Sequence, residues 1–274
     1  MPLSEKVFPV PALASITKRP SGRSSRRSKG FAKIASWGAS SPRVGLIYRP
    51  FEPLTFYASY ATSFLPQTAS VLNVASPPPS TGEQVEAGTR VDLTPGLTLS
   101  AAAFQIVRDN VAATDPRNPT FSVITGQQRS RGVEADLAGE ILPGWSIIGS
   151  VGLIDARITK DTTFAVGNRL TGVPVFSGSL WTTYAFQDGP LRGLGLGFGV
   201  THVGRRYGDL DNSFTVGAYN RLDALVYYDF DAHWRLSVNM RNLTNARYIE
   251  APTNATNNTP GAPFTVLATI TARL

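Results

Sequence analysis

The chain has 274 residues, no cysteine and a formal net charge of +7. The lack of cysteine excludes a disulfide framework and thiolate chemistry. His202 and His233 lie far apart and form no HxxxH or HExxH spacing, which disfavours a histidine metal site or a Ser/His/Asp triad. No run of 18 or more apolar residues is present, so a transmembrane helix is excluded, whereas membrane-spanning strands are not.

The net positive charge lies within the first 40 residues. They contain eight basic residues and one acidic residue and so account for the whole net charge of +7. Pro9, Pro11 and Pro20 interrupt any regular pattern there. The basic cluster follows the weakly apolar stretch, the reverse of the order in a signal peptide. We interpret 1–40 as a basic, disordered segment outside the fold, and disfavour a nucleic-acid-binding arm. The charge-balanced remainder is not expected to bind nucleic acid.

A two-residue hydrophobic period begins at Ser41 and continues to the C-terminus. It is clearest around the turn Leu142-Pro143-Gly144, where Val133, Ala135 and Leu137 alternate with polar or small residues. Such alternation predicts strands with one apolar face. The eleven predicted strands are 43–49, 54–64, 83–93, 97–110, 121–141, 145–159, 168–186, 194–207, 214–230, 234–248 and 262–274.

The connections between these strands alternate strictly between short and long. The short ones are 50–53, 94–96, 142–144, 187–193 and 231–233; the long ones are 65–82, 111–120, 160–167, 208–213 and 249–261. Outer-membrane barrels keep their long loops at one end, whereas a soluble sandwich has no reason to. The sequence therefore predicts an all-β fold, an antiparallel up-and-down transmembrane β-barrel.

Aromatic residues at the strand ends favour the same fold. Trp145 and Trp234 open strands beside short turns, while Phe64, Tyr207 and Tyr248 close strands beside long loops. Rings at both ends are typical of the two aromatic girdles of a membrane barrel. The alternative is the ordinary aromatic core of a sandwich.

Other candidate sites give weak signals. The stretch GLGLGFG at 193–199 fits a strand with a small-residue face better than a phosphate-binding loop. Asp209, Asp211 and Ser213 resemble the start of a calcium loop whose remaining ligands are missing, so a polar loop is favoured. Arg205, Tyr207 and the loop around Phe121 could face a ligand. No catalytic residues, metal ligands or cofactor site are expected, and no motif identifies ligand-binding residues.

The segments SPRVGLIYRP, YASYATSF, TGEQVEAGTRVDL, GQQRSRGVEADL, PGWSIIGSVG, RNLTNARYIE and PGAPFTV occur in this order between residues 41 and 274. Together they resemble the C-terminal part of the TonB-dependent siderophore receptors of the bacterial outer membrane. The resemblance implies a 22-stranded barrel plugged by an N-terminal domain, of which 41–274 supplies about eleven strands. It also implies binding of a ferric siderophore, energy coupling through TonB, and iron that arrives already chelated.

The resemblance assigns one further role and leaves some features unmatched. In this family the barrel-assembly machinery recognises an alternating apolar terminal strand. The resemblance assigns that role here to Val266, Ala268, Ile270, Ala272 and Leu274. The chain has Phe264 where the family usually has Arg, and ends in Leu274 rather than Phe. Signal peptide, plug and TonB-contacting box are not found in it.

The unmatched features lead to a fragment hypothesis. Eleven strands with two open edges would leave backbone groups unpaired in lipid. We therefore expect a C-terminal receptor fragment that arises from a frameshift or a misplaced start near residue 40, lacks the signal peptide, plug and TonB-contacting box, and is not expected to transport on its own. A small self-closed diffusion porin and a soluble all-β binding protein are the alternatives.

Overall fold

The computed structural model describes residues 7–14, 41–67, 77–115, 117–118 and 120–273. Twelve antiparallel strands form one sheet in the order β1-β2-β3-β4-β5-β6-β7-β8-β9-β12-β13-β16. The strands are β1 (Val7–Ala14), β2 (Ser41–Phe51), β3 (Leu54–Leu65), β4 (Ser80–Thr94), β5 (Leu97–Thr114), β6 (Ser122–Leu142), β7 (Trp145–Lys160), β8 (Phe176–Ala185), β9 (Leu194–Val203), β12 (Tyr219–Asp229), β13 (Trp234–Arg241) and β16 (Thr265–Ala272).

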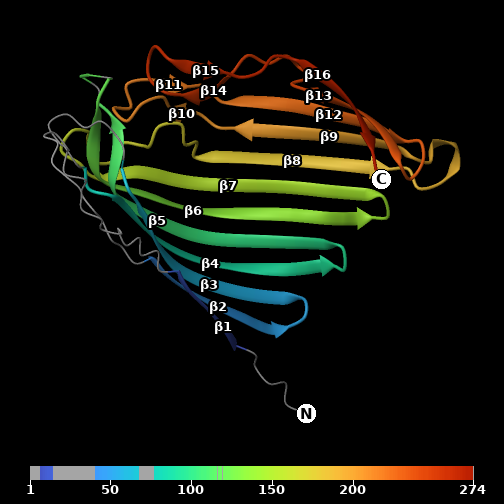
Figure 1. The fold of residues 1–274 in the computed structure, drawn as a ribbon, viewed down its shortest axis with the longest axis horizontal. Helices are drawn as coiled ribbons and strands as arrows, with labels where there is room; N and C mark the ends of the chain where they lie inside the picture. Colours follow the sequence, from blue (N-terminus) through green and yellow to red (C-terminus); the bar gives the residue numbers. More distant parts are fainter. Residues whose placement is uncertain (1–6, 15–40, 68–76, 116, 119, 274) are drawn as a thin grey trace, which may run out of the picture.

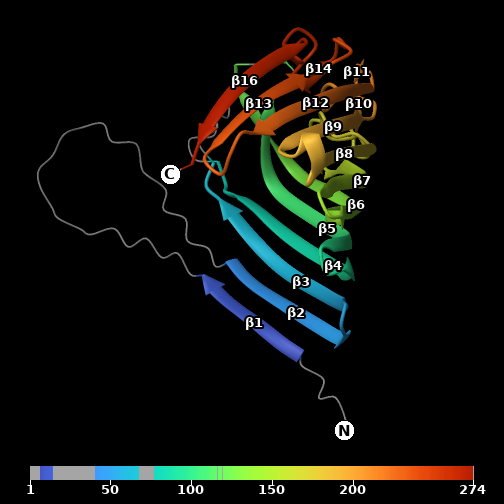
Figure 2. The ribbon, with the colours of Figure 1, turned by 90° about the vertical axis from the view of Figure 1, so that its right-hand side faces the viewer.

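The sheet is a curved wall. Its two ends, β1–β3 and β13–β16, bend toward the same side, and Figure 1 looks onto the concave face that results (Figures 1 and 2). β1 and β16 occupy the two edges of the strand order and are not paired with each other. The all-β, up-and-down prediction is thus confirmed, and the described residues form part of a barrel wall.

Strand β1 was not expected, because its prolines break the sequence pattern. Pro9 pairs with Leu46 and Pro11 with Val44 in the ladder to β2. Successive residues of an antiparallel strand direct their N–H groups alternately toward and away from the partner, so prolines two residues apart can both sit on the unpaired side. The expectation that 1–40 lies outside the fold therefore differs from the structure over Val7–Ala14. The rest of that segment, 1–6 and 15–40, lies outside the described residues.

Short and long connections lie at opposite ends of the wall (Figure 1). We call these the turn end and the loop end. The turn end includes the Thr94–Leu97 and Leu142–Trp145 reversals and a 3-10 helix, η1 (Gly189–Leu191). The loop end carries two small hairpins, β10 (Arg206–Tyr207) with β11 (Thr215–Val216), and β14 (Ile249–Pro252) with β15 (Asn258–Pro260).

Five predicted strands are longer than the observed ones. The predicted strand 168–186 begins only at Phe176, 262–274 begins only at Thr265, 194–207 divides into β9 and β10, 214–230 divides into β11 and β12, and 234–248 ends at Arg241. The last difference has a local cause, since Asn242 adopts a left-handed φ of 56° and turns the chain out of the ladder. Loop 249–261 is also more regular than predicted because it contains β14 and β15.

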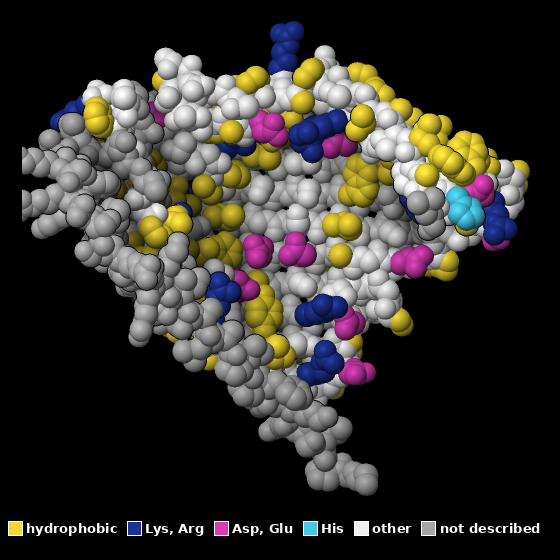
Figure 3. Space-filling model, in the orientation of Figure 1, with side chains coloured by type: hydrophobic (Ala, Val, Ile, Leu, Met, Phe, Trp, Pro, Cys, Tyr) yellow, Lys and Arg dark blue, Asp and Glu magenta, His cyan; other side chains and the backbone are white. Residues whose placement is uncertain are grey.

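The cross-strand register separates an apolar face from a polar one. On the convex face Met240 pairs with Val266, Val238 with Ala268, Leu236 with Ile270 and Trp234 with Ala272. Side chains opposite each other in the ladder share one face, so these pairs form a continuous apolar surface. The concave face carries rows of arginine and carboxylate side chains (Figure 3).

Glycines of β9 allow aromatic rings to lie on the concave face. A Cβ added to Gly199 would lie 2.2 Å from the Trp181 ring, and one added to Gly195 would lie 2.0 Å from the Tyr227 ring. Only glycine permits this approach, so the stretch 193–199 is indeed a strand with a small-residue face.

No layer formed by the described residues covers the convex face. Val151 is 50%, Leu153 52% and Ile270 71% exposed, whereas the few buried apolar side chains, such as Ile158 of β7 and Tyr248 before β14, lie toward the loop end of the wall. A large contiguous apolar surface needs an apolar partner or solvent. None of the described residues form a helix long and apolar enough to cross a membrane.

Aromatic residues mark the turn end of the convex face. Trp145 opens β7 and pairs with Tyr184, and Trp234 opens β13, as predicted. Tyr184–Phe186 and Tyr228–Phe230 form edge-on ring pairs at 5.0 and 5.1 Å. These side chains form a girdle at the turn end. The matching prediction for Tyr248 is wrong, because that ring is buried within the loop end.

Candidate functional site

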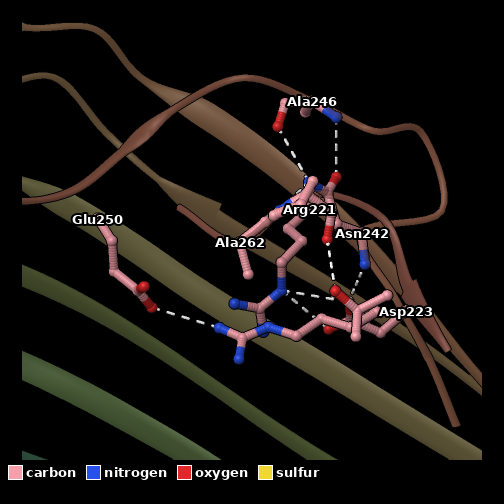
Figure 4. Close-up of polar contacts among 9 residues, drawn as sticks. Arg221, Asp223, Asn242, Ala246, Glu250 and Ala262 are labelled. Carbon is pink, nitrogen blue, oxygen red and sulfur yellow. Dashed lines mark hydrogen bonds and ion pairs between the residues drawn. The ribbon is translucent and has the colours of Figure 1, made fainter. Parts of the chain in front are cut away.

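Asn242 is the structural centre of the loop end. Its side chain is fully buried and donates through Nδ2 to the carbonyl oxygens of Ala246 (3.0 Å) and Ala262 (2.9 Å), while its Oδ1 accepts the Ala246 N–H (2.8 Å) (Figure 4). Asparagine tolerates the left-handed backbone that this corner requires. The motif RNLTNARYIE thus folds into a fixed corner that joins β13 to the 262–264 segment.

Asp223 connects this corner to the concave face. Its carboxylate accepts the backbone N–H of Asn242 at 2.9 Å and pairs with Arg221 Nε at 3.0 Å (Figure 4). Both side chains are mostly buried, with 18% and 17% of their surfaces exposed. Charge-assisted contacts in such surroundings fix both groups in position.

Arg206, at the start of β10, is the most buried arginine of the region, with 4% of its surface exposed. Its Nη2 donates to the carbonyl oxygens of Ile249 and Glu250, and its guanidinium carbon lies 5.5 Å from the centre of the Tyr219 ring. Tyr248 stacks on Tyr219 with ring centres 4.1 Å apart. Among the described residues no carboxylate pairs with Arg206, and its Nε has no partner.

A hollow of about 610 Å³ opens beside this cluster. It is lined by residues of the 216–218, 245–249 and 260–263 segments, including Arg247 and Tyr248. At its side Arg241 pairs with Glu250 at 3.3 Å, and both side chains remain nearly half exposed. We call Arg206, Tyr219, Arg221, Arg241 and Tyr248 the arginine–tyrosine cluster.

The surrounding loops hold the cluster in place. Asn212 clamps Arg169 by accepting its backbone N–H (2.8 Å) and donating to its carbonyl oxygen (2.9 Å). Gly172 donates its N–H to the Tyr207 carbonyl oxygen at 2.9 Å. The connections after β7 and β9 are therefore tied together at the loop end.

Carboxylates occupy the middle of the concave face (Figure 3). Glu86 accepts hydrogen bonds from the Tyr57 hydroxyl (2.9 Å) and from Gln84 (3.0 Å). Glu134 and Asp136 of β6, which is separated from β4 by β5, face the same side and form no ion pair with any described residue. The concave face therefore changes from acidic at its centre to arginine-rich at the loop end.

The structure places the three residues named as possible ligand contacts in different surroundings. Tyr207 lies at the loop end, half-buried, but Arg205 is exposed and its neighbour Arg206 is the one built into the site. Phe121 belongs to the separate connection between β5 and β6. The doublet of arginines at the end of a strand was a usable signal, although the sequence pattern could not tell which of them turns inward.

The acidic loop serves a structural purpose. Asp209 accepts the Ser213 N–H at 2.8 Å and the Ser213 hydroxyl, which closes the loop. The described residues contain no group of three or more potential metal ligands. His202 contacts Asn220 at 2.7 Å and the Phe176 ring.

The terminal-strand residues named from the sequence share one face. Val266, Ala268, Ile270 and Ala272 all project from the convex side of β16, and Leu274 lies outside the described residues. Their placement gives an apolar outer edge to the wall.

Comparison with known proteins identifies the family. The sequence profile described as "TonB dependent receptor-like, beta-barrel" matches residues 16–243. The chain is 35% identical over 235 residues to the metal-pseudopaline receptor of Pseudomonas aeruginosa and 36% identical over 238 residues to the ferrichrome outer membrane transporter/phage receptor of Escherichia coli. These matches cover 85% and 84% of this chain but only 33% and 32% of the relatives, so the chain spans about a third of their length.

Solved structures show the same wall. The siderophore receptor PiuA from Acinetobacter baumannii superposes with a TM-score of 0.71 at 26% identity, covering 89% of this chain and 38% of that one. The ferric yersiniabactin uptake receptor of Yersinia pestis gives a TM-score of 0.74 at 22% identity over 86% of this chain and 38% of that one, and supports the fold alone. The relatives are receptors and transporters of the bacterial outer membrane, and this chain belongs to the TonB-dependent receptor β-barrel family.

Proposed function

We propose that this chain is the C-terminal part of an outer-membrane receptor that takes up a ferric siderophore by binding and transport rather than catalysis. The observation that carries the proposal is the arginine–tyrosine cluster, placed on the concave face at the loop end of a wall whose outer face is apolar. Relatives named as siderophore or metal receptors support the same ligand class.

The chemistry of the cluster suits a chelated metal. Siderophore-bound iron needs no protein ligands, and the described residues offer no group of three or more that could hold it. An anionic complex is recognised by fixed guanidinium groups and aromatic faces. Arg221 and Arg241 are already paired with carboxylates, so within the arginine–tyrosine cluster Arg206 is the arginine that no described carboxylate neutralises.

The remaining parts of the mechanism lie outside the 41–274 barrel portion. We propose that a plug and a TonB-contacting segment precede this portion in the family's order. We also propose that the apolar residues of β16, with Leu274, serve as the assembly signal for the barrel-assembly machinery, and that lipid contacts the convex face.

Two alternatives are less well supported. A self-closed diffusion porin requires the edge strands β1 and β16 to pair, and they are not neighbours in the sheet. A soluble binding protein requires a covered apolar face, whereas Ile270 is 71% exposed. Ion conductance of the purified chain in a planar bilayer would favour the porin, and a folded monomer in detergent-free buffer would favour the soluble protein.

The test of the proposal is ligand binding by the folded chain in detergent. Tryptophan fluorescence is titrated with ferric complexes of hydroxamate, catecholate and mixed siderophores. One class should bind, and Arg206→Gln should weaken it by about tenfold or more because a desolvated charge contact is lost. Arg205→Gln, which changes an exposed neighbour, should leave binding unchanged. Equal effects of the two substitutions, or no binding by any complex, would contradict the proposal.

A further inference from the structure

A second arginine cluster lies on the opposite, convex face. Asp155 of β7 pairs with Arg157 at 2.7 Å, with Arg169 at 3.5 Å and with Arg131 of β6 at 3.7 Å. Arg131 and Asp155 are directly opposed in the ladder, two residues beyond the apolar pair Val133 and Leu153. The cluster therefore sits where the apolar band ends on the loop side.

The cluster carries excess positive charge. Three arginines share one aspartate, and a fourth, Arg129, faces the same side opposite Arg157 with its Nε buried and unpartnered. Other carboxylates on this face, Glu83 and Asp109, belong to β4 and β5 and pair with none of these arginines. Arg131 keeps 55% of its side-chain surface exposed, which leaves its guanidinium accessible from outside the wall.

An apolar hollow runs from this cluster toward the turn end. Its floor is made by small side chains, Ala87, Ala101, Ala103 and Ala135, on three adjacent strands, and Phe56 and Phe176 flank it. The hollow measures about 660 Å³. A second hollow of about 480 Å³ contains Arg131 and Asp155 and shares Val133 and Leu153 with the first. The two form one groove with an apolar body and a cationic head.

We propose that this groove binds a phosphorylated lipid, with its phosphate at Arg131 and Arg157 and an acyl chain along the alanine floor. From Trp145 to Leu153 the strand crosses about nine residues, the length that spans a bilayer core. The arginines thus lie at the depth of the lipid headgroups, where guanidinium–phosphate contacts are strong. The alanine floor removes the bulk that would otherwise exclude a chain.

The groove lies away from both edges of the sheet and on the face opposite the proposed ligand site. It is built from β3–β8, in the interior of the twelve-strand order. The proposal rests on the outward orientation of this face in the outer membrane and not on the identity of the transported ligand.

The test measures lipid retention by the full chain in detergent, using native mass spectrometry. The probes are phosphatidic acid, diacylglycerol with the same chains, and inorganic phosphate. We expect adducts with phosphatidic acid that survive activation, and no comparable adducts with diacylglycerol or with phosphate alone. Comparable binding of diacylglycerol would show that the cluster is not used. Comparable binding of phosphate would indicate an anion site without lipid specificity. Either result would overturn the proposal.

Two substitutions separate the head from the body of the groove. The double variant Arg131→Gln/Arg157→Gln should weaken phosphatidic acid binding by about tenfold or more through loss of charge-assisted contacts. Ala135→Phe should weaken it by filling the floor. Arg90→Gln, which removes an exposed arginine from the concave face, is the matched control and should have no effect. Circular dichroism and heat-modified gel mobility confirm that each variant is folded, and wild-type affinity in the folded double variant would refute the assignment.

Discussion

The two faces of the wall are built by the same strands but are stabilised in different ways. On β7, Val151 and Leu153 point outward and are about half exposed, while Ser150 and Gly152 face the concave side. The convex face needs only to be apolar. The concave face depends on particular contacts, such as the Ser150–Ser179 hydroxyl pair at 2.9 Å and Trp181 resting on Gly199. The stability of the convex face therefore depends on its apolar composition, whereas that of the concave face depends on individual residue contacts.

The largest effect is expected where the concave face joins the loops. Asn242→Ala removes three hydrogen bonds and leaves the half-buried backbone groups of Ala246 and Ala262 without these partners, at a cost of about 3–5 kcal/mol in the free energy of unfolding. Urea unfolding in vesicles measures it. Asn242→Gly keeps the left-handed backbone accessible, so the difference between the two variants isolates the backbone strain. Wild-type stability in both would show that the corner does not hold the loop end together.

A charge placed on either face tests the comparison directly. Ala101 points outward and its neighbour Ala102 points inward beside Glu134. Ala101→Arg should destabilise the chain by about 2–4 kcal/mol, the cost of an arginine near the bilayer midplane. Ala102→Arg should cost much less because it meets water and a carboxylate. The same urea unfolding in vesicles compares them, and equal losses would mean that the faces are wrongly assigned.

Glycines of the concave face test whether its ring contacts contribute to stability. Gly199→Val would place new atoms against the Trp181 ring and should cost about 1–3 kcal/mol by overpacking. Adding Trp181→Ala should recover part of that loss. Gly152→Ala, which meets no atom within 4 Å, is the control. Thermal unfolding of wild type, Gly199→Val, Trp181→Ala and the double variant shows whether the two effects are coupled. Simple additivity would contradict the proposed contact.

The smallest effect belongs to the turn end. The Asp231 carboxylate accepts the backbone N–H groups of His233 (2.7 Å) and Trp234 (2.9 Å), which lowers the pKa of Asp231. A lowered folded-state pKa gives stability that is present above the usual aspartate range and is lost as the pH falls through the folded value. Asp231→Asn should remove that contribution, so the stability difference from wild type should shrink on acidification. A difference independent of pH would exclude the carboxylate as its source.

The strands and short turns could be predicted because both are local properties. Alternation set the faces of β5–β7, and Pro143-Gly144 set the Leu142–Trp145 reversal. The ends of the strands at the loop side could not be predicted. The alternation of apolar and polar residues continues past Asn242, whereas the extended backbone of β13 ends at Arg241. That corner depends on hydrogen bonds to Ala262, 20 residues away, which no local pattern contains.

The candidate sites were harder to predict than the fold. Arg205 and Arg206 are equivalent in sequence, and only the β10–β11 hairpin decides that Arg206 turns toward Tyr219. Tyr248 fitted a girdle by position along the chain, yet it stacks within the loop end. The convex groove was missed altogether, because its arginines come from two strands and a loop that meet only in the folded sheet.

The central claim is that the convex face meets lipid and the concave face encloses an aqueous lumen. Because the chain has no cysteine, single cysteines at positions 146–153 of β7 can each carry a nitroxide label in a reconstituted bilayer. Collision rates with oxygen and with a water-soluble nickel complex should alternate with a period of two, oxygen dominating at 147, 149, 151 and 153. A reversed alternation, or none across the strand, would contradict the account.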